Sequence, residues 1–384
     1  MYIADVGLIN PLGHDWQAVS RLVAADVNSF SQVDMVCVKG KPIQASLFPT
    51  RLMRDLAIEP MGRDVVIDDD DYYEEYQAGE GETYRSLHEQ NAIQGALYCI
   101  RKLRSGLTKS VPILIGLPET QAHSFARQGR YDKPILDTFR RKLTALVPDI
   151  EAEYVTTIPA GRTAWHHTLH RAQAFFEQGF EFVIAGGTDS LLTSARLVQL
   201  NQHHRARSSA THNALTPGEG SCFMLLTNNI AQALTQHQRV IRLHAPGFAS
   251  ETVDWYDHHQ QPSRYEALDQ AFKQALSTLE PEQRISRIYS TMNGESFWAK
   301  EFGVAIIRNQ SAFAEQWQHE HPADSLGDTG AASAATQAAL AAFDLLNDVP
   351  DQANQTAHHL VYASADTQDR AAVVLSADLI HDQQ

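Results

Sequence analysis

Short apolar segments alternate along the first part of the chain with segments of helical periodicity. In the segment 89–103, apolar side chains recur at Ile93, Leu97 and Ile100 and therefore share one helical face. Gly179 is placed to end a later helix, because glycine accepts the left-handed conformation found at helix C-termini. The predicted strands are residues 2–9, 111–119 and 180–187, and the predicted helices are residues 15–25, 89–103 and 162–179.

The same alternation restarts after Asn229. The strands predicted here are residues 239–249, 285–294 (running into a loop), 358–365 and 371–379, and the helices are residues 264–279 and 330–346. Strands that alternate with helices predict an α/β fold with mostly parallel strands. The restart predicts two similar halves, residues 1–229 and 230–384.

Composition and charge narrow the class of protein. The chain has 384 residues, of which 43% are hydrophobic, and this length is enough to bury a large core. Its net charge of -15 repels phosphate backbones, so we expect no nucleic acid partner. No run of about 18 apolar residues occurs, so we expect no membrane span. The N-terminus lacks the features of a signal peptide. The three cysteines, Cys37, Cys99 and Cys222, are scattered along the chain. Both observations favour a cytoplasmic protein without disulfides.

An acidic segment interrupts the alternation at residues 64–82. Six carboxylates lie between Asp68 and Glu75, around two tyrosines. One interpretation is a solvated loop. The other is a docking patch, residues 68–75, for a basic partner or a cation. Calcium-type ligand spacing with a central glycine is absent, so metal binding is the weaker form of the second interpretation.

Several motifs, in order along nearly the whole chain, resemble the β-ketoacyl synthase family of the thiolase fold. They are VGLINPLGHDWQAV at 6–19, GFEFVIAGGTDSLL at 179–192, LTPGEGSCFMLL at 215–226, SLGDTGAASAATQAAL at 325–340 and LVYASADTQDRAAVVL at 360–375. Each motif is weak alone, but five in register are specific. The resemblance implies two similar βαβαβαββ halves that form a five-layer α-β-α-β-α sandwich.

The residue that carries the chemistry of that family is missing. A ketosynthase holds its acyl group as a thioester on a cysteine at a helix N-terminus, where backbone N–H groups favour the thiolate. By the resemblance, this position falls on Gly161, which has no side chain to acylate. The nearby hydroxyl of Thr163 is a poor substitute, because its spacing predicts a position inside the helix rather than at the turn.

The two histidines that polarise the thioester carbonyl in the family are missing as well. Asn293 takes the first position, where it can donate a hydrogen bond but cannot shuttle a proton. Asp328 takes the second, where a carboxylate would repel an oxyanion. The family's lysine ahead of the second histidine is absent, and DTQDR at 366–370 replaces its glycine loop. The resemblance therefore implies that no catalytic residue of the condensing reaction remains.

Histidines close to Gly161 allow a different site. His166 and His170 share a helical face at i, i+4, and Glu295 or Asp328 would complete an acid–base pair or a metal site with them. The more common arrangement is that such histidines pack or lie at the surface. No third ligand has a recognisable spacing, so we expect no metal and no cofactor.

The segment MNGES forms a polar tip at the expected pocket. It is either a binding determinant or a turn with Asn-Gly in the left-handed conformation. The residues predicted to contribute to binding are Gly161, Arg162, Thr163, His166, Asn293, Gly294, Glu295 and Asp328.

Three functions are compatible with these features. The first is a catalytically silent protein that acts through binding, as a subunit of a homodimer or heterodimer or as an adaptor. The resemblance also implies a link to type VI secretion effectors, beside which degenerate thiolase-like proteins are encoded. The second is an acyltransferase, hydrolase or β-ketoacyl-carrier-protein synthase with a non-standard site. The third is a non-covalent carrier of an acyl chain or small metabolite.

Overall fold

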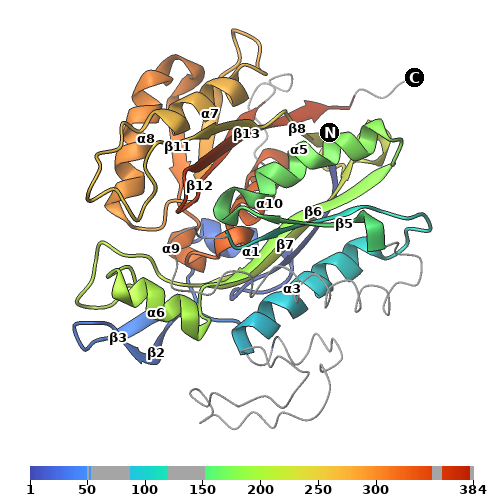
Figure 1. The fold of residues 1–384 in the computed structure, drawn as a ribbon. Helices are drawn as coiled ribbons and strands as arrows, with labels where there is room; N and C mark the ends of the chain where they lie inside the picture. Colours follow the sequence, from blue (N-terminus) through green and yellow to red (C-terminus); the bar gives the residue numbers. More distant parts are fainter. Residues whose placement is uncertain (50–51, 53–86, 120–151, 348–356, 381–384) are drawn as a thin grey trace, which may run out of the picture.

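The fold was analysed in a computed structural model, which describes residues 1–49, 52, 87–119, 152–347 and 357–380 (Figure 1). The acidic segment 64–82 lies outside the described residues, so both interpretations of it stay predictions.

The sheet of the first half contains five strands. They are β1 (Tyr2–Ile9), β4 (Ile113–Leu117), β5 (Val155–Pro159), β6 (Phe182–Ser190) and β7 (Glu219–Thr227). Their order across the sheet is β5-β4-β6-β7-β1. Strand β4 is parallel to β5 and β6, whereas β7 is antiparallel to β6 and β1.

The second half repeats this arrangement. Its strands are β8 (Arg239–Leu243), β10 (Ile285–Ser290), β11 (Phe313–Glu320), β12 (His358–Ser364) and β13 (Asp369–Leu379), and β9 (Gly247–Ser250) pairs with β13. Their order across the sheet is β11-β10-β12-β13-β8. Leaving β9 aside, both halves therefore place their third, second, fourth, fifth and first strands side by side, in that order. Tyr2 of β1 pairs with Arg242 of β8 and joins the two sets of strands. The two sets of strands are therefore arranged alike, and the division of the chain at residue 229 stays a prediction.

Fewer strands are parallel than the alternation predicted. Among the described strands, each half has two parallel pairs, whereas the first half has two antiparallel pairs and the second has three. The last strand of each half, β7 or β13, runs antiparallel to the strands on both sides of it. In the second half, β12 and β13 form a hairpin, with only residues 365–368 between them.

The helices complete five layers (Figure 1). They are α1 (Trp16–Ala24), α3 (Leu87–Arg104), α5 (Ala164–Glu177), α6 (Ser194–Gln202), α7 (Glu266–Leu276), α8 (Ser296–Arg308), α9 (Ala323–Leu326) and α10 (Ser333–Asn347). Helix α3 packs on β1, β6 and β7, and α7 packs on β9 and β13 with α8 beside it. Helices α5 and α10 contact strands of both halves. The five-layer sandwich that the resemblance implied is therefore confirmed.

Alternating side chains show how each sheet is covered on both faces. Leu360 and Tyr362 of β12 belong to the apolar cluster under α7 and α8, whereas Val361 and Ala363 belong to the central cluster around α10. A strand covered on both faces is apolar throughout, which explains the continuous apolar runs in the sequence.

Small residues allow the central layer to pack closely. Most of α10 is buried, and alanine is its commonest residue. A Cβ atom on Gly187 of β6 would lie 2.0 Å from the carbonyl oxygen of Ala331, so only glycine fits there. Ala331 belongs to the 3-10 turn that precedes α10. The Gly-Gly motif at the end of β6 therefore sets the distance between the sheet and the central layer.

Shorter elements connect these layers. They are the hairpin of β2 (Phe30–Val36) and β3 (Pro42–Ser46) and the 3-10 turns η1 (Ala152–Tyr154), η2 (Gly161–Thr163), η3 (Ile230–Gln232), η4 (Gln310–Ala312) and η5 (Gly330–Ala332). Among the described residues, no helix has the length and apolar character needed to cross a membrane.

Three buried histidines couple the fold to pH. Burial lowers the pKa of His166 and of His358 to about 4, and that of His359 to about 3. All three are therefore neutral in the folded protein near pH 7, whereas an unfolded histidine takes up a proton below about pH 6.5.

We expect the free energy of unfolding to fall as the pH decreases from about 6.5 towards about 4, because the unfolded chain binds protons that the folded chain does not. Each of the three histidines contributes up to about 1.4 kcal/mol per pH unit to the slope of the free energy of unfolding in this window. Urea unfolding across the window measures the slope. The variant His359→Leu should flatten it, whereas His212→Leu, at an exposed position, should not. A profile without slope would contradict the prediction.

Candidate functional site

Gly161 begins the turn that leads from β5 into α5. Its φ of +57° lies in the left-handed region, which disfavours any other residue. A Cβ atom at this position would lie 3.1 Å from the carboxyl carbon of Glu119 and 3.3 Å from its Cβ and Cγ. The side chain of Glu119, from the end of β4, therefore occupies the space in front of Gly161.

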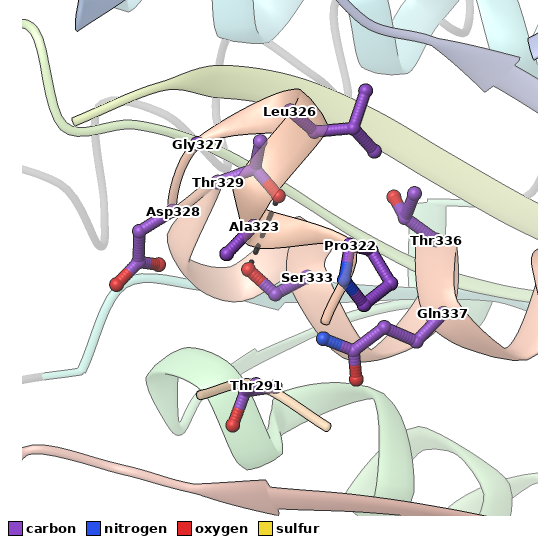
Figure 2. Close-up of a pocket in the computed structure, with 10 residues that line it drawn as sticks. All are labelled: Thr291, Pro322, Ala323, Leu326, Gly327, Asp328, Thr329, Ser333, Thr336 and Gln337. Atoms are coloured by element: carbon purple, nitrogen blue, oxygen red, sulfur yellow. Dashed lines mark hydrogen bonds between the residues drawn. The ribbon is translucent and has the colours of Figure 1, made fainter. Parts of the chain in front are cut away.

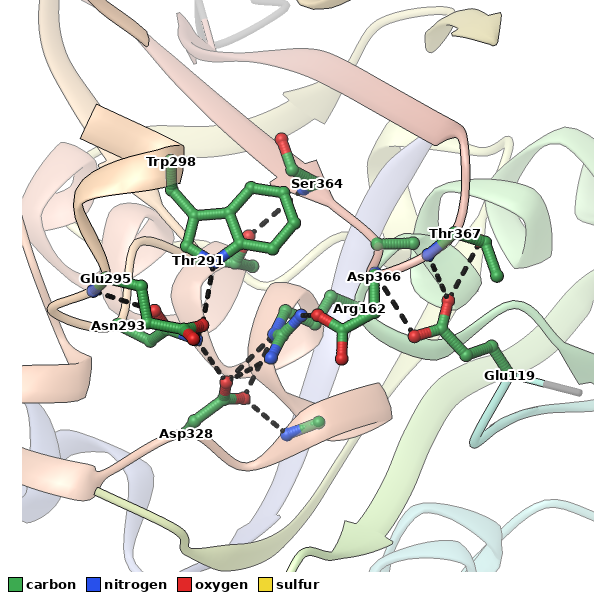
Figure 3. Close-up of polar contacts among 12 residues, drawn as sticks. Glu119, Arg162, Thr291, Asn293, Glu295, Trp298, Asp328, Ser364, Asp366 and Thr367 are labelled. Atoms are coloured by element: carbon green, nitrogen blue, oxygen red, sulfur yellow. Dashed lines mark hydrogen bonds and ion pairs between the residues drawn. The ribbon is translucent and has the colours of Figure 1, made fainter. Parts of the chain in front are cut away.

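Arg162 is buried and binds two carboxylates of the second half (Figure 3). Its Nε donates to Asp328 Oδ2 at 2.9 Å, its Nη2 donates to the same carboxylate, and its Nη1 donates to Asp366 Oδ1 at 2.7 Å. Asp328 also accepts hydrogen bonds from Asn293 Nδ2 at 2.7 Å and from the backbone N–H of Gly330 at 3.0 Å. Both oxygens of the Asp328 carboxylate thus accept hydrogen bonds from other groups of the protein.

Arg205 makes a second pair of contacts of the same kind. Its Nε and Nη2 bind the two oxygens of Glu295, each at 2.7 Å, and its Nη1 binds Asp366 Oδ2 at 2.6 Å. The indole N–H of Trp298 donates to Glu295 at 3.0 Å, and the guanidinium carbon of Arg205 lies 3.8 Å from the ring centre of Trp255. Two-point contacts of this kind fix both position and orientation.

We call these six residues the cross-half network: Arg162, Arg205, Asn293, Glu295, Asp328 and Asp366. Both arginines come from residues 1–229, and all three carboxylates come from residues 230–384. Every ion pair in the network therefore joins one half of the chain to the other. Asp366 binds both arginines and links the two sets of contacts.

Arg162, Arg205 and Asp366 stay charged at neutral pH. Burial alone would lower the pKa of Arg162, but the charges of Asp328 and Asp366 outweigh it and hold that pKa well above its usual value. For Arg205, Asp366 and Glu295 outweigh burial in the same way and raise the pKa. Burial would raise the pKa of Asp366, but the two arginines hold it well below its usual range.

The structure brings together four of the predicted binding residues: Arg162, Asn293, Glu295 and Asp328. Gly161 lies beside this group because it precedes Arg162 in the chain. Gly294 has a φ of +95°, as the Asn-Gly turn interpretation requires. Whether any of these residues binds a partner stays a prediction.

Thr163 and the histidines of α5 lie to one side of the network. Thr163 is at the first turn of the helix rather than inside it, because the 3-10 turn begins at Gly161. Its hydroxyl donates to Asp369 at 2.6 Å. His166 contacts the carbonyl oxygen of Val361 at 3.2 Å, whereas His170 is exposed. Neither histidine contacts Glu295 or Asp328 in the described structure, and no described group of three potential ligands could hold a metal ion.

Sequence reasoning missed Glu119, Arg205 and Asp366. One signal was available for Asp366, because the DTQDR loop replaces glycines with charged residues where the resemblance places the pocket. A second signal was a pair of opposite charges. Arg162 follows Gly161, Asp328 takes a histidine position of the family, and the resemblance brings these positions together. Arg205 and Glu119 had no such signal.

A small pocket remains beside the network (Figure 2). It has a volume of about 10 Å³ and is lined by polar groups of Thr291, Ser333, Thr336 and Gln337. The Nε2 of Gln337 donates to the carbonyl oxygen of Ser290 at 2.6 Å, while its Oε1 is buried without a protein partner. Such a volume holds one water molecule, and an acyl chain does not fit in it.

Solved structures with the same arrangement of strands and helices are ketosynthases and their partners. One is the ishigamide ketosynthase/chain length factor, with a TM-score of 0.67, 13% identity and coverage of 97% of this chain and 98% of that chain. Another is a ketosynthase in complex with its chain length factor from Xenorhabdus doucetiae, with a TM-score of 0.64, 15% identity and coverage of 98% of each chain. The chain has the ketosynthase fold. Identities this low describe the fold and leave function open.

A third similar structure with the ketosynthase fold is a type II polyketide synthase acyl-carrier protein in complex with its ketosynthase, with a TM-score of 0.65, 12% identity and coverage of 97% of this chain and 98% of that chain. Residues 241–348 also match the family model for the C-terminal part of the type VI lipase adapter protein Tla3. The comparison with curated proteins gives no match. In this ketosynthase fold, the matched segment runs from β8 to α10 and contributes Asn293, Glu295 and Asp328 to the network.

We expect Arg162→Met to lower the free energy of unfolding by about 3–5 kcal/mol, because it leaves Asp328 and Asp366 buried with less compensation. Adding Asp328→Asn to this variant should recover part of the loss. Denaturant unfolding with a double-mutant cycle measures both effects.

The matched control is Lys109→Met, which removes an exposed ion pair with Glu181. It should cost less than about 1 kcal/mol. Equal losses for Arg162→Met and Lys109→Met would show that the cross-half network does not hold the two halves together.

Proposed function

We propose that this chain is a catalytically inactive ketosynthase-fold protein that acts as an adaptor for a lipase effector of type VI secretion. The observation that carries the proposal is the match of residues 241–348 to the Tla3 adapter model. The motif resemblance supports it independently, because it led to the same class of partner.

The geometry around Gly161 supports the absence of condensing chemistry. A nucleophile needs a side chain, room for an acyl group, and donors aimed at the developing oxyanion. Here the space in front of Gly161 holds Glu119, and Asn293 and Asp328 bond to each other at 2.7 Å. Carboxylates in this place repel an oxyanion, and the pocket beside them, of about 10 Å³, is too small for an acyl chain.

A dimer is the second part of the proposal. Similar structures include a ketosynthase in complex with its chain length factor, in which two related chains associate. By analogy, this chain pairs with a copy of itself or with a related subunit. Light scattering after size-exclusion chromatography measures the mass directly.

Co-expression with a type VI lipase from the same organism is expected to yield a stable complex. Ile307 on α8 is 71% exposed and lies in the matched segment, whereas Ile230 is 41% exposed and lies outside it. Ile307→Asp should weaken the complex by about tenfold or more, since exposed apolar side chains near an interface centre contribute about 1.4 kcal/mol or more.

Ile230→Asp is the matched control and should leave the affinity unchanged. Titration calorimetry with each variant gives the two dissociation constants. Absence of any complex with such lipases, under conditions where the chain is folded, would overturn the adaptor proposal.

Incubation with acyl-coenzyme A or with an acylated carrier protein should give no covalent adduct. Intact-mass spectrometry and thiol release measure the two possible signs of turnover. The control is the chain with Cys37, Cys99 and Cys222 replaced by alanine, since all three thiols are buried but chemically acylatable. A mass gain that persists in this variant would favour the acyltransferase alternative.

A further inference from the structure

Glu119 differs from the three carboxylates of the cross-half network, because it binds backbone N–H groups and no arginine within the described residues. Its Oε1 accepts from the backbone N–H of Asp366 at 3.1 Å. Its Oε2 accepts from the backbone N–H of Thr367 at 3.2 Å and from the Thr367 hydroxyl at 2.9 Å (Figure 3). We call these three donors the hairpin nest. Consecutive N–H groups that converge in this way form an anion-binding concavity.

The hairpin nest is held in place from its other side. Arg370 is completely buried, binds Glu301 at 2.5 Å, and donates to the carbonyl oxygens of Ala365 at 3.0 Å and Thr367 at 2.7 Å. The carbonyl oxygen of Asp366 accepts from the N–H of Trp255 at 2.8 Å. The carbonyl groups of Ala365, Asp366 and Thr367 thus accept hydrogen bonds from other residues. The N–H groups of Asp366 and Thr367 point at the Glu119 carboxylate.

Few interactions hold the side chain of Glu119 in this position. Within the described residues it forms no ion pair, and the carboxylate of Asp366 is its neighbour. Burial and the charge of Asp366 raise its pKa more than the charges of Arg162 and Arg196 lower it, so its charged form is less favourable here than in water.

We propose that the hairpin nest is a carboxylate-binding site that Glu119 fills from within the chain and that an external carboxylate takes when Glu119 leaves. The argument rests on three converging donors, their anchoring by Arg370, and a resident carboxylate that forms no ion pair within the described residues. The ligand is a small or terminal carboxylate, supplied either by a free short-chain acid or by the C-terminus of a peptide. This site goes beyond the adaptor function and does not depend on it.

The test is chemical rescue of Glu119→Ala. This substitution removes one methylene and the carboxylate, which together match acetate in shape. Acetate at about 100 mM should raise the melting temperature of the variant by about 2 °C or more relative to sodium chloride at equal ionic strength, because it binds only the folded state. The wild-type chain should shift by less than half as much, since Glu119 already fills the site.

Two further measurements make the result specific. Glu119→Ala combined with Thr367→Val lacks one of the three donors and should lose most of the acetate response. A short peptide with a free C-terminal carboxylate, compared with its C-terminal amide, separates a peptide source from a free acid. Stabilisation by the free peptide but not by acetate assigns the site to a chain terminus.

Equal acetate responses of wild type and Glu119→Ala, or no response of the variant to acetate or peptide, would overturn the proposal. If Glu119→Ala does not fold in sodium chloride, refolding in acetate replaces the melting measurement. Recovery of the fold in acetate supports the site, and failure in both salts counts against it. None of these outcomes depends on the lipase partner.

Discussion

A buried guanidinium is costly unless acceptors such as carboxylates compensate its charge, and this constraint organises the centre of the molecule. Arg162 and Arg205 lie in the first half of the chain, and the carboxylates that neutralise them lie in the second. Either half alone would carry uncompensated charges into the core, at a cost of several kcal/mol per ion. The network therefore favours only the arrangement in which the two halves dock in this register.

The same network shows how a ketosynthase fold is compatible with a packed ionic centre. The layers depend on close contacts far from the reacting groups, such as Gly187 against Ala331 and the alanines of α10. Those contacts require small side chains and do not require a nucleophile. A site in this fold can thus change from a cavity into a packed ionic core while the sheets and the central helices stay in place.

Much of the fold could be predicted from the sequence, because fully covered strands are continuously apolar and α10 is rich in alanine. The hairpin β2–β3, helix α8 and strand β11 were missed, since each has polar residues on an exposed side that obscure its period. The motif resemblance brought Gly161, Asn293 and Asp328 to one place, as the contacts of Arg162 and Asn293 with Asp328 bear out. The role of Arg205 could not be predicted, because nothing local in the sequence distinguishes it from the other basic residues of the chain.

The position of Asp366 between two arginines has a consequence for evolution. A single substitution at Arg162, Arg205 or Asp366 leaves a charge in the core without its partner, which costs several kcal/mol. Variants of this kind fall below the stability that a folded protein needs, so selection removes them. The members of the charged centre are therefore expected to change together or not at all.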